Sequence, residues 1–280
     1  MKIAVTSASG QLGSAILTQL LQTQDKQDLV AIARNPQKAQ HHGIETRAGD
    51  YINKEQFLKA LQGVDTVLLV SGMDAPENRI QQHRNVIQAA VESGVKKIVY
   101  TSVIGPSAGT AFSPVVKSNR QTEQDVRASG LEWSIGRNGL YIEPDIEYID
   151  HYKKAGKIAN CAADGKCSYT TRSELAYAYS QMITDDQRNN HTFNLGGEPI
   201  TQQQLTEFLN KTFNTNLIYE SMSVADYKSE RQAELGEFLG TVIAGIYEGI
   251  RTGQMQFESD FTKAAGRVHI TWKDYFNSLK

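Results

Sequence analysis

The stretch Thr6-Ser7-Ala8-Ser9-Gly10-Gln11-Leu12-Gly13 decides the fold class, because it connects a short apolar run to a helical pattern. Ile3 to Val5 form the apolar run, and Leu12, Ile16 and Leu20 recur at every fourth position after it. Small residues between a strand and a helix let backbone N–H groups approach a pyrophosphate at the helix N-terminus. The stretch therefore predicts a dinucleotide-binding α/β fold.

The loop departs at one position from the Gly-x-x-Gly-x-x-Gly pattern of short-chain and extended dehydrogenases. Ser7 stands at the first position of that pattern, whereas Gly10 and Gly13 occupy the other two. A side chain restricts φ, so we expect Ser7 to reshape the turn and to weaken cofactor binding without abolishing it. Two glycines that open a helix are also compatible with an ordinary structural turn.

The charge after the second predicted strand favours the cofactor interpretation. Arg34 follows Ala31 to Ala33, at the place where NAD-specific proteins carry an acidic residue for the ribose 2′-hydroxyl. A guanidinium binds a phosphate through two hydrogen bonds, whereas a carboxylate would be repelled by a 2′-phosphate. We therefore predict NADP(H) as the cofactor, with Lys38 as a second cation. The alternative for Arg34 is a solvated surface charge.

Short apolar runs alternate with helical patterns in the first half of the chain, as in a parallel doubly wound sheet. Such runs are typical of strands that helices cover on both faces. The predicted strands are Ile3 to Val5, Leu29 to Ala33, Thr66 to Val70, Lys97 to Thr101 and Trp133 to Ile135. We expect a Rossmann domain over residues 1–139. A smaller α/β substrate region over residues 140–280 is expected to return one strand, Thr192 to Leu195, to the sheet.

Helical patterns dominate the second half of the chain. They cover Ser173 to Ile183, Thr201 to Phe213 and Ala225 to Arg251. Four glycines recur at intervals of four or five residues in the last pattern: Gly236, Gly240, Gly245 and Gly249. Close packing against another backbone is the favoured interpretation of this spacing, and a mobile lid is the alternative.

Composition and charge limit the class of protein. The 280 residues carry a formal net charge of -2 and are 40% hydrophobic, which argues against a disordered chain and against a nucleic-acid partner. Cys161 and Cys167 are too few for a disulfide framework and lack the spacing of a zinc site, so no metal is expected. No apolar run has the length of a signal peptide core or a membrane span. We expect a cytoplasmic protein without a membrane partner.

Five short motifs occur in the order found in one known family. They are Gly10-Gln11-Leu12-Gly13, Arg34-Asn35-Pro36, Gly49-Asp50-Tyr51, Gly94-Val95-Lys96-Lys97-Ile98 and Arg137-Asn138-Gly139-Leu140-Tyr141. The chain resembles the NmrA-like atypical short-chain dehydrogenases, and within them the bacterial NAD(P)H:quinone oxidoreductases and triphenylmethane reductases. The resemblance runs almost from end to end and includes Thr170 to Leu175. It implies a Rossmann fold, a small quinone-like substrate and a homodimer.

The resemblance also implies which residues contact the cofactor. The loop from Ser7 to Leu12 and Arg34 are expected at the phosphates. The residues expected at the ribose and nicotinamide are Ser71, Gly72, Met73, Asn138, Gly139, Leu140, Tyr141, Ile142 and Glu143. Arg172 matches a family position at the cofactor site. The alternative is structural, because Thr171 to Glu174 has capping-box spacing, which would place Arg172 in a first helical turn.

The catalytic set is sparse. Ordinary short-chain dehydrogenases use a serine beside Tyr-x-x-x-Lys, in which the tyrosine transfers a proton. Ser102 stands where that serine is expected, but Ser113 lies four residues before Lys117. Many NmrA-like enzymes carry a lysine four residues before a helical glutamate; with Glu123 as that glutamate, Asn119 takes the lysine's place. Two residues on a helix differ by about 200°, so Lys117 and Asn119 cannot both face the cofactor. An alcohol or ketone reductase is disfavoured.

A quinone accepts hydride without that machinery, because positioning supplies most of the catalysis. Tyr141 is the candidate for shaping the pocket or donating a hydrogen bond, and Ser102 and Lys117 are further catalytic candidates. The leading hypothesis is an NADPH-dependent reductase of quinones or similar conjugated acceptors. The alternative is a dinucleotide-sensing regulator without turnover, which Ser7 and Asn119 favour.

Overall fold

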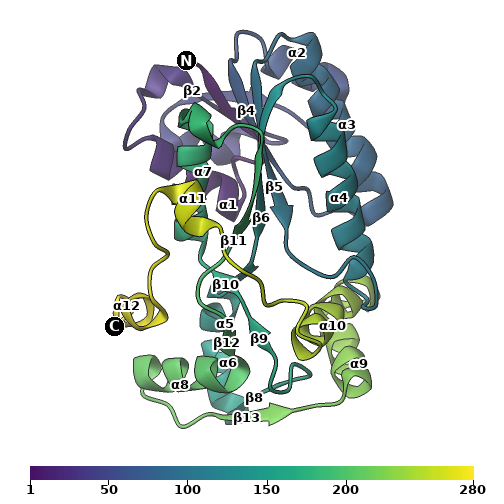
Figure 1. Cartoon of the computed structure of the whole chain (residues 1–280), viewed down its shortest axis with the longest axis vertical. Helices are drawn as coiled ribbons and strands as arrows, with labels where there is room; N and C mark the ends of the chain where they lie inside the picture. Colours follow the sequence, from purple (N-terminus) through teal and green to yellow (C-terminus); the bar gives the residue numbers. More distant parts are fainter.

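Seven parallel strands form the central sheet in the computed structural model, which describes residues 1–280 (Figure 1). In the order of the sheet they are β11 (His191–Leu195), β6 (Glu132–Asn138), β5 (Lys97–Val103), β4 (Thr66–Val70), β1 (Ile3–Val5), β2 (Leu29–Ala33) and β3 (Glu45–Ala48). The chain order reverses at β1, which pairs with β2 on one side and β4 on the other. In open α/β sheets such a reversal opens a ligand-binding crevice at the carboxyl ends of the strands.

Helices cover both faces of the sheet, which explains why its inner strands are apolar on both sides. One face carries α1 (Gln11–Leu20), α7 (Arg172–Thr184) and α11 (Phe261–Ala265). The other face carries α2 (Lys54–Ala60), α3 (Pro76–Glu92) and α4 (Ser113–Arg127). Successive strand residues point to opposite faces, so Ile3 and Val5 pack in the first layer and Ala4 packs in the second.

The rest of the second half forms a smaller region toward which the arrows of β5 and β6 point (Figure 1). Its helices are α5 (Glu143–Glu147), α6 (Ile149–Ala155), α8 (Gln202–Phe213), α9 (Val224–Leu235), α10 (Glu237–Arg251) and α12 (Trp272–Asn277). Three two-stranded sheets pair β7 (Leu140–Tyr141) with β10 (Tyr169–Thr170), β9 (Lys166–Cys167) with β12 (Ile200–Thr201), and β8 (Lys157–Asn160) with β13 (Ile218–Ser221). The carboxyl edge of the main sheet therefore faces this region.

Most of the expected elements are present, with two differences. All five predicted strands of the first half form, and β11, from the second half, pairs parallel with β6 in the main sheet. The sequence does not predict β3, because this edge strand is polar and has no fully buried residue. The helix expected over residues 225–251 is two helices, because Gly236, with a φ of +84°, separates α9 from α10.

The glycines of α10 confirm close packing at two positions. A Cβ at Gly240 would collide with the backbone of Arg231, and one at Gly245 would collide with the backbone of Ala111 and Phe112. Gly245 thereby lets α10 pack against the chain just before α4. No helix of the protein combines the length and apolar character that crossing a membrane requires.

Candidate functional site

The loop after β1 keeps the left-handed turn although it begins with a serine. Ser7 has a φ of +50°, in the region that glycine adopts most easily. The Gly10 amide donates to the Ser7 carbonyl at 2.8 Å, which closes the turn. Gly13 packs on the same peptide, because a Cβ there would lie 3.0 Å from the Ser7 carbonyl carbon and 3.2 Å from the Thr6 carbonyl oxygen. Ser7 therefore takes the left-handed conformation itself, and the turn closes at Gly10.

Tyr51 forms hydrogen bonds that connect this loop to β4. Its hydroxyl donates to the Val70 carbonyl at 2.6 Å. Its oxygen lies 2.6 Å from the Thr6 hydroxyl and 3.0 Å from the Ser7 hydroxyl, both of which can donate to it. Burial raises the pKa of Tyr51 to about 12, against the opposing effect of the two hydroxyls, so it stays protonated. The side chain of Ser7 is thus part of what holds the loop.

The start of α1 is suited to an anion. Gly10 is the N-cap and provides no side-chain cap, and the first turn of α1 has no acidic residue. The first amides of a helix lack intrahelical partners, and the helix dipole favours negative charge there. The residues present therefore fit the pyrophosphate of a dinucleotide.

Arg34 directly follows β2, the strand that this loop contacts, and Lys38 lies four residues further along the chain. The Ala8 amide donates to the Ile32 carbonyl at 3.0 Å and the Gly49 amide donates to the Ala33 carbonyl at 3.1 Å, so the connections after β1 and β3 both lie against the end of β2. Both basic side chains are exposed. Two cations at the end of β2 fit a ribose 2′-phosphate.

The segment after β4 is held by side chains on the adjacent elements. The Ser71 amide donates to the Thr101 hydroxyl at 2.9 Å, and the Gly72 amide donates to Nε2 of His83 at 3.0 Å. Met73 follows with 87% of its side chain exposed. The three predicted residues therefore lie at the carboxyl edge of the sheet, next to β1.

Asn119 faces this segment and Lys117 does not. Oδ1 of Asn119 accepts hydrogen bonds from the Tyr100 hydroxyl at 2.7 Å and from the Ser71 hydroxyl at 3.2 Å. Lys117 is exposed on the other side of α4. The two side chains therefore point in different directions, as the helix geometry predicts. An uncharged amide stands at the position where many NmrA-like enzymes carry a lysine.

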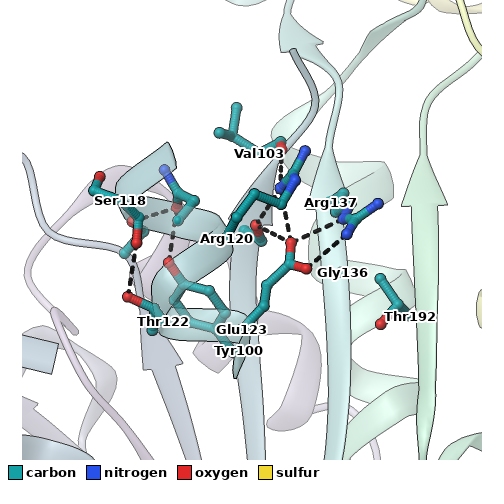
Figure 2. Close-up of polar contacts among 12 residues, drawn as sticks. Tyr100, Val103, Ser118, Arg120, Thr122, Glu123, Gly136, Arg137 and Thr192 are labelled. Atoms are coloured by element: carbon teal, nitrogen blue, oxygen red, sulfur yellow. Dashed lines mark hydrogen bonds and ion pairs between the residues drawn. The ribbon is translucent and has the colours of Figure 1, made fainter. Parts of the chain in front are cut away.

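Figure 2 shows the Glu123 carboxylate between Arg120 and Arg137. Ser102 belongs to this buried charge cluster. The Glu123 carboxylate accepts from Ser102 at 2.7 Å and from Arg120 at 2.7 Å, and it forms a bidentate pair with Arg137 at 2.8 and 2.7 Å. Arg127 is a further partner at 3.1 Å. Burial raises the pKa of Glu123, but the Arg137 hydrogen bonds and the Arg120 charge outweigh it and lower the pKa to about 2. Ser102 therefore donates its proton to a carboxylate.

Tyr141 has a hydroxyl proton free to donate. Nδ2 of Asn138 donates to the Tyr141 oxygen at 3.3 Å. The Tyr179 hydroxyl lies 2.7 Å from Oδ1 of Asn138 and 2.9 Å from the Gly136 carbonyl oxygen. Burial raises the pKa of Tyr141, against the opposing effects of Asn138 and Arg172. Tyr141 therefore accepts one hydrogen bond within the chain and keeps its own proton for a ligand.

Glu143 and Arg172 meet beside Tyr141. Oε1 of Glu143 accepts from the Arg172 amide at 2.6 Å, and the Arg172 guanidinium lies 5.8 Å from the centre of the Tyr141 ring. Oε2 of Glu143 and Nε of Arg172 are buried without a hydrogen-bond partner in the chain. Such orphaned polar atoms are costly unless a ligand binds them, so they fit a cofactor carrying amide and hydroxyl groups.

Arg172 also fulfils the structural expectation in part. It opens α7, and the N-cap Thr171 accepts from the Glu174 amide at 3.0 Å. The reciprocal half of the capping box does not form, because the Glu174 carboxylate binds Arg267 instead. The two interpretations of Arg172 are therefore compatible.

The remaining predicted residues line the turn from β6 to β7. A Cβ at Gly139 would collide with the Ser168 carbonyl, so only glycine lets β6 and β10 approach here. Leu140 is half-buried and Ile142 is fully buried in the second region. These two support the site through packing.

Sequence reasoning missed Tyr51 and His83. Tyr51 stands in one of the family motifs, but nothing in the sequence shows that its hydroxyl reaches the first loop. His83 lies on the apolar side of α3, which includes Ile87 and Ala90. A polar residue on such a side could have indicated a buried hydrogen bond. The Tyr51 contacts span 45 and 44 residues of the chain, and the contact between His83 and Gly72 spans 11.

Comparisons with known proteins agree with this geometry. A family described as NAD(P)H-binding matches residues 7–186. Quinone oxidoreductase 2 of Escherichia coli is 35% identical over 229 residues, which cover 80% of this chain and 79% of that protein. The E. coli NADPH-dependent quinone oxidoreductase in complex with NADPH has a TM-score of 0.90 at 31% identity over 99% of both chains. The Citrobacter triphenylmethane reductase with NADP(H) gives 0.91 at 30% identity over 100% of both chains. Motifs, fold and similarity over the full length agree that the chain belongs to the NAD(P)H-binding, NmrA-like family of oxidoreductases.

Proposed function

We propose that the protein is an NADPH-dependent reductase of quinones or similar conjugated acceptors. One observation carries the substrate class: the quinone oxidoreductase 2 of E. coli is 35% identical over 80% of the chain, and its structure aligns with 99% of the chain at 31% identity. The sparse catalytic set agrees with it, because Lys117 faces away from the segment after β4 and Ser102 is bonded to Glu123. An acceptor that needs strong acid catalysis would be poorly served by such a site.

When bound, NADPH would supply the hydride that reduces the electron-poor ring. The first loop and the start of α1 would hold its pyrophosphate, and Arg34 with Lys38 would hold its 2′-phosphate. Tyr141, whose oxygen accepts from Asn138, would donate its O–H to the oxyanion that forms on the acceptor. One proton, from water directly or through Tyr141, would complete the hydroquinone. Glu143 and Arg172 would orient the bound molecules through their unpaired atoms.

The proposal includes a preference for NADPH over NADH, which rests on Arg34. It also includes a substrate role for residues 140–280, a cytoplasmic location and a homodimer. The two buried, unpaired thiols Cys161 and Cys167 support a reducing compartment. Light scattering of the purified protein tests the dimer.

The decisive experiment follows the loss of NADPH absorbance with a benzoquinone or a naphthoquinone as the acceptor. NADPH is compared with NADH, and the unmodified protein with Arg34→Ala. We expect turnover that prefers NADPH and a loss of that preference in the variant. Clear NADPH binding without reduction of any quinone or dye would refute the reductase and favour a dinucleotide-sensing regulator.

A further inference from the structure

His83 is a buried histidine that joins three elements near the cofactor crevice. It lies on α3 with 1% of its surface exposed, and its ring contacts the rings of Tyr51 and Tyr100 edge-on. Nε2 lies 3.0 Å from the Gly72 amide nitrogen, and Nδ1 lies 2.9 Å from the Thr122 hydroxyl. The side chain thus connects the segment after β4 to α4.

The hydrogen bonds of His83 run in one direction. The Gly72 amide can only donate, so Nε2 must accept and carries no proton. The proton of the neutral ring therefore lies on Nδ1 and is donated to Thr122, whose hydroxyl donates to the Ser118 carbonyl at 3.2 Å. Burial, together with the nearby Arg79 guanidinium, lowers the pKa of His83 to about 3. Arg79 is itself 5% exposed and is held by the Ser118 hydroxyl at 2.9 Å.

This arrangement fixes the peptide that joins Ser71 to Gly72. In a trans peptide the C=O and the N–H point in opposite directions, so the Ser71 carbonyl points away from His83. The preceding peptide is fixed as well, because the Ser71 amide donates to Thr101 and the Val70 carbonyl accepts from Tyr51. The Ser71 carbonyl accepts no hydrogen bond from the chain. It is left as an acceptor at the carboxyl edge of the sheet.

We infer that His83 is a positioning residue for NADPH: its neutral, Nδ1-protonated ring holds the Gly72 peptide so that the Ser71 carbonyl accepts a hydroxyl of the cofactor ribose. This inference rests on the proposed function. The two ring nitrogens have different roles, because only Nε2 contacts the segment that we assign to the cofactor. A side chain that supplies an acceptor at the Nε2 position should therefore preserve cofactor binding.

The test compares His83→Gln with His83→Phe. Glutamine places an amide oxygen near the Nε2 position, whereas phenylalanine keeps the aromatic packing and leaves the Gly72 amide unsatisfied. His191→Gln, at an exposed position of β11, is the matched control. The dissociation constant of NADPH is measured by fluorescence titration, and KM for NADPH and kcat are measured with a naphthoquinone. In His83→Phe the Gly72 peptide can turn in the free protein to satisfy its amide, and NADPH binding must then turn it back. We expect this to weaken Kd and KM by about 5- to 30-fold, with a smaller change in kcat.

His83→Gln should recover most of the affinity. Unchanged Kd in His83→Phe, or equal losses in two folded variants, would overturn the inference while the reductase assignment stands. Failure of the unmodified protein to bind NADPH would overturn both. The tautomer is tested without a variant by ¹⁵N NMR of the unmodified protein, where an Nδ1-protonated ring that does not titrate between pH 5 and 8 is expected. An Nε2-protonated or titrating His83 would overturn the inference.

Discussion

Gly13→Ala is the most direct test of how the first loop is built. The added Cβ would lie 3.0 Å from the Ser7 carbonyl carbon and 3.2 Å from the Thr6 carbonyl oxygen, with the Ser7 carbonyl oxygen closer still. All three are backbone atoms, so no flexible side chain can move aside. Either α1 shifts away from β1 or the peptide at Ser7 rotates, and each change displaces amides that we assign to the pyrophosphate.

Two opposing effects set the size of the change in stability. Replacing glycine by alanine inside a helix gains roughly 0.5 to 1 kcal/mol. Overpacking against backbone costs about 1 to 3 kcal/mol. We therefore expect the free energy of unfolding to fall by up to about 2.5 kcal/mol. The affinity for NADPH should fall as well, because the strain lies in the loop that we assign to the cofactor.

Urea denaturation and fluorescence titration with NADPH measure the two effects separately. Gly249→Ala is the matched control, because this glycine also lies in a helix and a Cβ there would meet nothing closer than 3.4 Å. The control should be neutral or stabilised and should bind NADPH normally. If Gly13→Ala bound NADPH as tightly as the unmodified protein, the assignment of this loop to the pyrophosphate would be refuted.

Three further predictions concern charge. Arg34→Asp should shift the ratio of kcat/KM for NADPH over NADH toward NADH by about 10- to 100-fold, because a charge-assisted phosphate contact becomes a repulsion; an unchanged ratio would exclude Arg34 from the site. Glu123→Gln should cost about 3 to 5 kcal/mol in urea denaturation at pH 7, because it leaves clustered arginines without their carboxylate. Its folded pKa of about 2 lies below the ordinary 4.5, so the stabilisation should be present above pH 4.5 and vanish as the pH falls toward 2. Burial raises the pKa of Asp145 from 3.8 to about 6, so Asp145→Asn should gain on the order of 3 kcal/mol at pH 8 and little at pH 4, with the Tyr152 hydroxyl bond retained.

The fold was largely predictable because its inner strands are continuous apolar runs. Ile3 to Val5 and Thr66 to Val70 are fully buried, and burial on both faces leaves a pattern that reads directly as a parallel strand. β3 escaped prediction because an edge strand needs no apolar face. The division into α9 and α10 also escaped it, since a glycine within a helical pattern does not by itself reveal its φ.

The candidate site was predictable where one segment supplies the chemistry. The first loop, Arg34 and Tyr141 each stand in a motif whose residue types point to their role. The environment of those residues was not predictable. Nothing local to Ser102 indicates that Glu123 takes its proton, and nothing local to Gly72 indicates that His83 receives its amide.

The sequence by itself determined the doubly wound sheet, the dinucleotide loop and the basic residue after β2, because each depends on periodicity or spacing within a short stretch. Only the tertiary structure decided that Ser7 keeps a left-handed turn with the help of Tyr51, and that Asn138 leaves the Tyr141 proton free. The physical reason is that hydrogen-bond direction and burial depend on which distant segments the fold brings into contact.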